Sequence, residues 1–306
     1  MEENIKEEII KPKKSLIYIF VFRVLLIAGI LFIVSNYLFA SPLNSKNATL
    51  HISSRDSLTK ISENLINNNV IKNKFIFKSL VYFFSGDRNI HNGDYLFKKG
   101  SSVIAVSWQI SRGRHDVLPL RVTFREGMTN NEMADVLAQK ISVFRRDLFI
   151  SDPRSKQGYL FPDTYYFFSL STTDEILNDM SSNFENRINP LKKSIKDSGH
   201  SIEEIIIMAS ILEKEASGKD DIGVISGILW KRIKLGMPLQ VDVAESTYRK
   251  SGLPEVAIGN PGFLAIKAAI SPVNSPYLFY LHDDGRQVHY AVDFSQHRSN
   301  IARYLK

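Results

Sequence analysis

The chain has 306 residues, and 39 Lys and Arg against 32 Asp and Glu give a net charge of +7. This length allows about two domains with buried cores. A hydrophobic content of 44% and a charged content of 23% exclude a disordered or collagen-like chain. The absence of cysteine excludes a disulfide framework, thiolate catalysis and Cys-ligated metal sites. We find no zinc-finger, P-loop or RNA-binding signature, so the positive charge favours an anionic lipid or polymer over nucleic acid.

A long apolar stretch at residues 16–40 follows a polar tail at residues 1–15, and its one charged residue is Arg23. A helix of this length crosses a hydrocarbon layer of about 30 Å. Lysines cluster at residues 11–14, whereas Lys46 and Arg55 are the basic residues just after the stretch. The asymmetry predicts a single-pass helix in the cell membrane with the C-terminal part outside the cytoplasm. The alternative, a cleaved signal peptide, has a shorter apolar region and a small-residue cleavage site, which Leu38-Phe39-Ala40 does not provide.

The part after the linker at residues 41–47 is predicted to contain two regions, a small α+β module at 48–118 and a mixed α+β region at 119–306. In the module, Thr49–Ser53 alternates like a strand. Asp56 or Ser57 caps a helix that ends near Asn67–Asn69, and its apolar residues are Leu58, Ile61 and Leu65. A hairpin near Gly93–Phe97 and a helix over Val103–Ile110 complete the predicted module.

A similar strand, turn and helix recur at the start of the second region. Leu120–Phe124 is strand-like, Glu126–Thr129 is a turn with a cap, and Met133, Val136 and Leu137 have helical spacing. The echo is too weak to indicate a solenoid repeat. The predicted fold class is therefore α+β with one N-terminal transmembrane helix.

A strongly apolar helix is predicted further along the second region. Ser201 and Glu204 have the spacing of a capping box, and Ile205–Leu212 is apolar on almost every face, as in a helix buried all round. The segment ends in Glu213-Lys214-Glu215. These charges have two explanations: the helix emerges into water, or one carboxyl lies at the floor of a cleft.

Glu215 is the better candidate for a functional carboxyl. Positions 213 and 215 are about 200° apart on a helix, so at most one of them faces a given cleft. Glu215 continues the stripe of Ile205, Met208 and Leu212. A helix C-terminus and burial both disfavour a negative charge. A carboxyl kept protonated near neutral pH is what a general acid requires.

Several further sequence segments, spread in order over residues 48–306, form a recognisable pattern. They are Gly158–Tyr165, Met208–Glu215, Arg232–Asp242, Gly252–Pro254, Ile258–Gly262, Lys267–Ala269, Pro272, Pro276–Phe279, His289 and His297. Together they resemble the endolytic murein transglycosylases of the MltG (YceG-like) family. In that family the second glutamate of the Glu-Lys-Glu segment is the catalytic acid, which corresponds to Glu215.

The resemblance implies an enzyme that cuts peptidoglycan glycan strands internally, between MurNAc and GlcNAc, and leaves 1,6-anhydroMurNAc ends. It also implies that the enzyme acts beside peptidoglycan synthases and ends the growth of nascent strands. No cofactor is expected. No carboxylate–histidine cluster with metal-ligand spacing accompanies His289 and His297, so we expect no metal site.

One departure from the pattern of LysM domains and two from the family pattern leave the proposed acid untouched. The module opens like a LysM domain, but Arg55 stands where glycine is usual, so the module is either glycan-binding or a structural βα unit. Only Val243–Ser251 separates two segments between which the family has a longer insertion. Arg298 follows His297 where the family tends to have asparagine. The short insertion affects one wall of the expected cleft and its glycan selectivity.

Four further polar residues are candidates for substrate binding. Gln240 and Asp242 alternate with apolar residues, so from a strand both face one groove, or else a solvated sheet face. Asn260 begins the turn Asn260-Pro261-Gly262, whose backbone is a candidate groove lining. Tyr165 either stacks on a sugar or belongs to the core.

Two other functions remain open from the sequence. A hydrolytic muramidase needs a second carboxylate, for which Asp242 is the candidate. A non-catalytic wall-binding anchor protein would use the LysM-like module alone.

Overall fold

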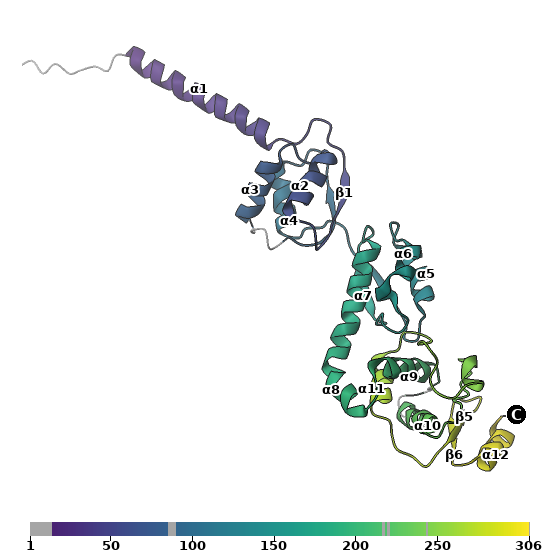
Figure 1. The fold of residues 1–306 in the computed structure, drawn as a ribbon. Helices are drawn as coiled ribbons and strands as arrows, with labels where there is room; N and C mark the ends of the chain where they lie inside the picture. The colour runs from purple at the N-terminus through teal and green to yellow at the C-terminus, as the bar shows by residue number, and fades with distance from the viewer. Residues whose placement is uncertain (1–13, 85–89, 216–217, 219–220, 243, 306) are drawn as a thin grey trace, which may run out of the picture. The chain divides into compact units, whose positions relative to one another are not determined.

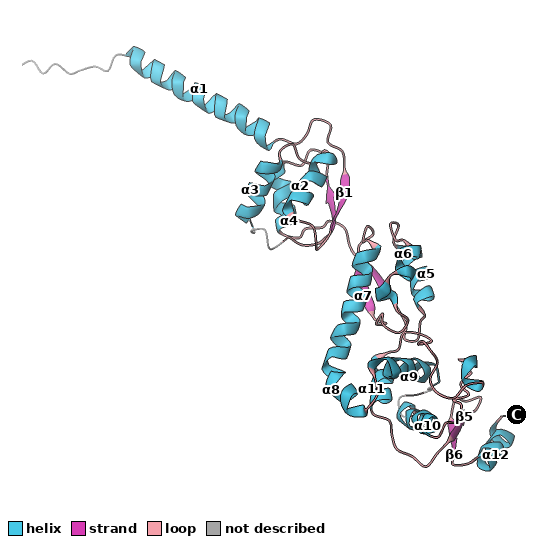
Figure 2. Ribbon diagram, viewed as in Figure 1, coloured by secondary structure: helices cyan, strands magenta, loops and turns pink. Residues whose placement is uncertain are grey.

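The computed structural model describes residues 14–84, 90–215, 218, 221–242 and 244–305 (Figure 1). The chain divides into two compact units, Met1–Val117 and Leu118–Lys306. Helices dominate both units, and the described strands form short antiparallel pairs (Figure 2). The predicted α+β class is confirmed.

The first unit begins with the long helix α1, Lys14–Phe39. Its segment Ile17–Asn36 has a mean hydropathy of 2.8, and none of it is buried inside the protein. Among the described residues, this is the one helix long and apolar enough to cross a membrane. A lipid-exposed helix is hydrophobic all round, as this one is, so it is compatible with a single-pass anchor.

The rest of the first unit is a small module built on two strands. Strand β1, Ala48–Ile52, pairs antiparallel with β2, Gly93–Phe97, with Ala48 opposite Phe97 and Ile52 opposite Gly93. The predicted hairpin at Gly93–Phe97 is wrong, because this strand pairs with β1 instead of with a neighbour along the chain. Both pairing strands bury side chains in the module core, which fixes their register.

Three helices cover this strand pair: α2 (Leu58–Asn67), α3 (Lys74–Phe84) and α4 (Val103–Ser111). Ser57 caps α2 by accepting a hydrogen bond from the Lys60 backbone N–H at 3.2 Å, as predicted. The apolar stripe Leu58, Ile61 and Leu65 is buried. Helix α3 was not predicted from the sequence, although its Phe77 and Val81 are fully buried.

The second unit starts with a layer around the strands β3, Leu120–Thr123, and β4, Thr164–Phe167. Thr129 and Glu132 form a capping box at the start of α5, where the Glu132 N–H donates to Thr129 Oγ1 at 3.2 Å. The core of this layer is apolar and is shared by the strands and helices. Its helices are α5 (Asn130–Lys140), α6 (Arg146–Ser151) and α7 (Thr173–Ile188).

A second layer of the same unit is built on α9, Ile202–Glu215, which packs against α11, Phe263–Ile270. Around them lie α8 (Lys192–Ser198), α10 (Ile222–Lys234), the strand pair β5 (Phe279–His282) and β6 (Val288–Ala291), and α12 (Phe294–Tyr304). Short 3₁₀ turns occur at Pro153–Ser155, Asn189–Leu191 and Glu245–Tyr248. The residues of α9, α10 and α11 make the larger of the two cores in this unit.

Candidate active site

Helix α9 places Glu215 at its last position. The capping box at its start has the predicted form: the Ser201 N–H donates to Glu204 Oε2 at 2.8 Å, and the Glu204 N–H donates to Ser201 Oγ at 3.2 Å. All residues of Ile205–Leu212 are buried, so tertiary packing holds the helix on every side. This rigid support fixes where the carboxyl at the end of the helix lies.

Glu215 lines a cleft with a volume of about 620 Å³. Segments far apart in the sequence build its walls: the end of α9, the helix α10, the loop after α10, the strand β5 and the helix α12. The lining is mixed, with polar and aromatic side chains. Its residues are Glu215, Arg232, Leu239, Gln240, Asp242, Tyr248, Phe279, Tyr280, Leu281, His282, Phe294, His297, Ile301 and Leu305.

The pKa of Glu215 is raised above its ordinary value. Burial is the main cause, and the negative charge of Asp242 acts in the same direction. The hydroxyl of Tyr280 donates a hydrogen bond to Glu215 Oε2 at 3.1 Å, which partly opposes the shift because it stabilises the carboxylate. The site therefore favours the protonated carboxyl while it holds the group in one orientation.

Arg232 organises the floor of the same cleft. Its Nε donates to the backbone oxygen of Pro238 at 3.0 Å, and its Nη2 donates to Gln240 Oε1 at 2.7 Å. Burial lowers the pKa of this guanidinium. Gln240 itself is exposed and has a φ of 52°, a left-handed conformation that is uncommon for a residue with a side chain. Arg232 thus orients the Gln240 amide group, whose NH₂ makes no hydrogen bond among the described residues.

Asp242 lies in the cleft with Tyr248, whose hydroxyl donates to Asp242 Oδ1. This hydrogen bond is the main reason that the pKa of Tyr248 is raised. The neighbours Leu239 and Val241 are buried while Gln240 and Asp242 are exposed, so the alternation in the sequence is present in the structure. The predicted strand is not, because the segment is irregular and makes a single bridge, between Pro238 and Ser251. The backbone of this segment is held by hydrogen bonds to Arg232 and to the turn at Glu245–Tyr248 instead of by a neighbouring strand.

Glu213 occupies a different environment, although it lies two residues before Glu215. Its Oε2 accepts a hydrogen bond from the Gly262 N–H at 2.8 Å, at the start of α11. Burial raises its pKa, and the nearby charge of Glu126 adds to the effect. A Cβ at Gly262 would lie 1.8 Å from Glu126 Oε1, so a larger residue there would force the exposed Glu126 side chain to move. Glu213 does not line the cleft and joins two helices.

Asn260, predicted to bind substrate, is fully buried and does not line the cleft. Its Oδ1 accepts hydrogen bonds from the N–H groups of Gly158 and Leu160, both at 3.1 Å. Its Nδ2 donates to the Met128 carbonyl at 2.9 Å and to Asn130 Oδ1 at 2.6 Å. The side chain is thus saturated with internal bonds and joins three segments of the chain.

Tyr165, the other predicted binding residue outside the cleft, belongs to the core of the β3–β4 layer. Its hydroxyl donates to the Phe161 carbonyl at 2.6 Å and accepts from Asn183 Nδ2 at 3.0 Å. Its ring stacks on Phe167, with centroids 5.5 Å apart. The core alternative for Tyr165, which the sequence left open, is therefore the one that the structure has.

The two histidines singled out in the sequence lie in different surroundings. His289 bonds to Asp283 Oδ2 at 2.8 Å and stacks on Tyr304. His297 stacks on Phe279 and lines the cleft, where burial lowers its pKa. In the part of the chain that the structure describes, no group of three or more His, Asp or Glu residues is placed to hold a metal ion.

Sequence reasoning missed several residues that the fold brings to Glu215. Tyr280 was not singled out, and Arg232 was noted only as part of a family segment. In helix α12, His297 was singled out as part of the family pattern but Phe294 was not, although both line the cleft. No pattern in the sequence marks Arg232, because its burial and its hydrogen bond to Gln240 are properties of the fold.

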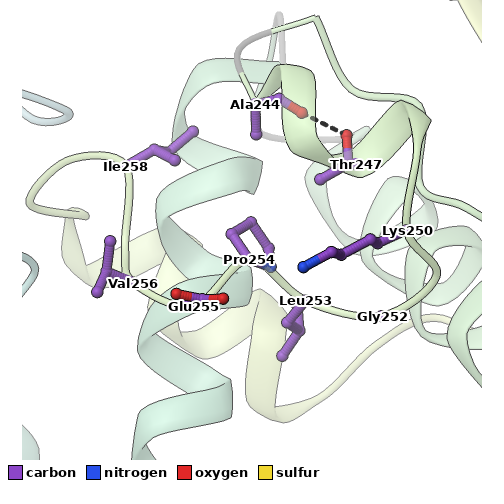
Figure 3. Close-up of a pocket in the computed structure, with 9 residues that line it drawn as sticks. All are labelled: Ala244, Thr247, Lys250, Gly252, Leu253, Pro254, Glu255, Val256 and Ile258. Carbon is purple, nitrogen blue, oxygen red and sulfur yellow. Dashed lines mark hydrogen bonds between the residues drawn. The ribbon is translucent and has the colours of Figure 1, made fainter.

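A second cavity, of about 400 Å³, is lined by side chains from residues 244–258 (Figure 3). Leu253, Pro254 and Val256 give it an apolar lining, and Lys250 and Glu255 add one charge of each sign. The Thr247 hydroxyl, also in the lining, donates to the Ala244 carbonyl at 2.6 Å. The carboxyl that lines this cavity, Glu255, is exposed, whereas Glu215 is half-buried. We therefore place the candidate active site in the cleft.

The fold and the cleft together place a carboxyl with a raised pKa in a mixed polar and aromatic cleft of an α+β protein with an N-terminal apolar helix. The model of the YceG-like family matches residues 50–245 and 246–303. The chain belongs to this family.

Two relatives carry the name endolytic murein transglycosylase. That of Bacillus subtilis strain 168 is 24% identical over 305 residues, which cover 84% of this chain and 84% of that protein. That of Streptococcus pneumoniae serotype 2 strain D39 is 23% identical over 327 residues and 86% of this chain, but the match spans only 59% of its own length. Among solved structures, a YceG-like protein from Listeria monocytogenes has a TM-score of 0.55 and 23% identity, covering 84% of this chain and 99% of that one. This likeness supports the fold.

Proposed function

We propose that the protein is an endolytic murein transglycosylase, which cleaves peptidoglycan glycan strands between MurNAc and GlcNAc and leaves 1,6-anhydroMurNAc ends. The observation that carries the proposal is the half-buried Glu215, with a raised pKa, in a cleft of about 620 Å³. Membership of the YceG-like family and the names of the two relatives support the same reaction.

The reaction needs one carboxyl. Protonated Glu215 gives its proton to the oxygen that links MurNAc C1 to the next sugar, and the C1–O bond breaks with both electrons leaving on that oxygen. The C6 hydroxyl of the same MurNAc then forms a bond to C1 and loses its proton to the Glu215 carboxylate. Because this hydroxyl is tethered to the reacting ring, it has a proximity advantage over water. The cycle ends with Glu215 protonated again.

Other residues of the cleft position the glycan in this proposal. The Gln240 NH₂ group and the Asp242 carboxylate are hydrogen-bonding partners for sugar hydroxyls, and Arg232 and Tyr248 fix their orientation. Phe279 and His297, stacked with centroids 5.1 Å apart, offer an aromatic wall on which a sugar face can pack. Tyr280 is a positioning residue, because it acts on the substrate through Glu215.

The anchor and the partners complete the proposal. Helix α1 holds the protein in the cell membrane, with its C-terminal part outside the cytoplasm, since lysines cluster on the N-terminal side. A reporter fused to the C-terminus is expected to be active only outside the cytoplasm. A position beside the growing glycan would place the enzyme next to peptidoglycan synthases, and crosslinking in intact cells tests this partnership.

A hydrolytic muramidase is the second candidate, because Asp242 lines the same cleft and raises the pKa of Glu215. Two carboxyls in one cleft are the arrangement of ordinary glycoside hydrolases. One digest of purified glycan strands by the full chain separates the two functions. We expect mass spectrometry to find anhydro ends, lighter by one water than reducing ends. Reducing MurNAc ends, lost in Asp242→Asn, would identify the hydrolase.

A further inference from the structure

The module at residues 48–117 exposes an aromatic face that its own fold does not use. We define this aromatic face as Phe75, Tyr82, Phe83, Phe84 and Trp108. On α3, Phe77 and Val81 point into the core, whereas Phe75, Tyr82 and Phe83 are 76%, 55% and 84% exposed. Large aromatic side chains so exposed and so close together are unusual on a soluble surface and indicate a binding surface.

Three rings of the aromatic face, those of Phe83, Phe84 and Trp108, form a chain of contacts. Phe83 and Phe84 have centroids 5.7 Å apart, and Phe84 meets Trp108 of α4 edge-on at 5.2 Å. Trp108 is 40% exposed, and the Arg112 guanidinium lies over its ring at 4.5 Å. The face therefore combines bulky apolar rings, amphipathic Tyr and Trp side chains and a neighbouring positive charge.

The charge of the chain is concentrated on the same module. Residues 48–117 contain ten Lys and Arg against five Asp and Glu, whereas residues 118–306 contain twenty-three of each. Lys74, at the start of α3, is exposed beside Phe75. Basic residues together with Trp, Tyr and Phe are the composition of surfaces that lie at the boundary between lipid headgroups and acyl chains.

The module is also tied closely to the segment that crosses the membrane. The apolar span ends at Asn36 and β1 begins at Ala48, so even a fully extended connection reaches at most about 40 Å. Phe39, at the end of α1, already packs against the module core. A short tether keeps the module next to the bilayer surface and raises the effective concentration of lipid around it.

We propose that the aromatic face inserts into the outer boundary of the membrane that holds α1, and that it holds the module against the lipid surface. The inference rests on the proposed insertion of α1 but is independent of the glycan chemistry. It assigns the module a lipid-binding role instead of, or before, any contact with glycan.

The test uses the full chain in nanodiscs that contain phosphatidylcholine and phosphatidylglycerol brominated near the headgroup. The chain has two tryptophans, Trp108 on the aromatic face and Trp230, which is 9% exposed and lies in the core of the second unit. Bromine quenches tryptophan on contact, so we expect Trp108 to lose about half of its fluorescence, as a residue at the lipid boundary would. The variant Trp108→Phe gives the baseline from Trp230.

A double variant sharpens the test. Phe75→Ser with Phe83→Ser changes exposed side chains only, so the fold is retained, and the quenching of Trp108 is expected to fall to background. Tyr166→Ser, which removes a 63% exposed aromatic ring of the second unit, is the matched control and should leave quenching unchanged. Circular dichroism verifies the fold of each variant.

Each other outcome overturns the proposal. Equal quenching in the parent protein and in Trp108→Phe would show that the face does not reach lipid. If Trp108 fluorescence changed with purified glycan strands but not with brominated lipid, the aromatic face would be a glycan-binding surface. Failure of the chain to co-elute with nanodiscs would reject both the anchor and this inference. Murein cleavage, assayed in the same sample, tests the enzymatic proposal separately.

Discussion

The junction around Glu213 and the cleft around Glu215 lie at the same end of α9, yet their polar side chains find hydrogen-bond partners in different ways. At the junction, backbone groups satisfy the side chains: Gly262 donates to Glu213, and Gly158 and Leu160 donate to Asn260. In the cleft, side chains hold one another, as Tyr280 holds Glu215 and Arg232 holds Gln240. Burial raises the pKa of both glutamates, so a raised pKa alone does not identify a catalytic acid. Access to a cleft separates them.

The largest expected effect distinguishes the two glutamates by activity. Glu215→Gln should lower murein cleavage by at least about a hundredfold, since the amide cannot act as the acid. Glu213→Gln should keep most of the activity, because an amide oxygen can still accept from Gly262. Release of anhydro ends from purified strands measures both. Full activity of Glu215→Gln would reject the assignment of the acid.

The junction is expected to respond through stability. Asn260→Ala leaves the buried N–H groups of Gly158 and Leu160 without their acceptor, and we expect a loss of about 2–4 kcal/mol in the free energy of unfolding. Denaturant unfolding measures this loss. The control Asn131→Ala, an exposed asparagine that accepts only from Arg146, should change stability little. If Asn260→Ala were stable but unable to bind glycan, Asn260 would be a binding residue after all.

A smaller effect concerns the orientation of the acid. Tyr280→Phe removes a hydrogen bond that stabilises the Glu215 carboxylate, so the pKa of Glu215 should rise further. The basic limb of the kcat/KM profile should therefore move to higher pH, with a rate reduced several-fold at the optimum. The control is Tyr290→Phe, on the strand that pairs with the strand of Tyr280. It loses a hydrogen bond to Asp221 and should leave the basic limb in place. An unmoved limb in Tyr280→Phe would mean that the tyrosine only supports the fold.

The smallest expected effect is on the way in which the stability of the folded protein depends on pH. Because the folded pKa of Glu215 lies above its ordinary value of 4.5, the folded protein binds this proton more tightly than the unfolded chain does. The carboxyl therefore costs stability as pH rises above 4.5 toward its folded pKa. Glu215→Gln should be slightly more stable than the parent protein at neutral pH, and the difference should disappear in acid. Thermal melts across this range measure it; a less stable variant at neutral pH would contradict the account.

The sequence predicted the elements with strong local signals and missed those that depend on long-range packing. The capping box at Ser201, the buried helix after it and the apolar span near the N-terminus all follow from spacing and composition. The burial of Asn260 was not predicted, because a turn composition says nothing about which segments meet around it. Tyr280 and Arg232 escaped notice because their partners, Glu215 and Gln240, are brought to them by the fold, in the case of Tyr280 from 65 positions away in the chain.

The central claim is that one carboxyl and the substrate's own C6 hydroxyl complete the reaction without water. The most direct measurement is a digest of purified glycan strands by the full chain in water enriched in oxygen-18, followed by mass spectrometry of the new MurNAc ends. The account predicts anhydro ends that carry no oxygen from the solvent. New reducing ends that carry one solvent oxygen each would contradict it and would move the assignment to a hydrolase with Asp242 as its second carboxylate.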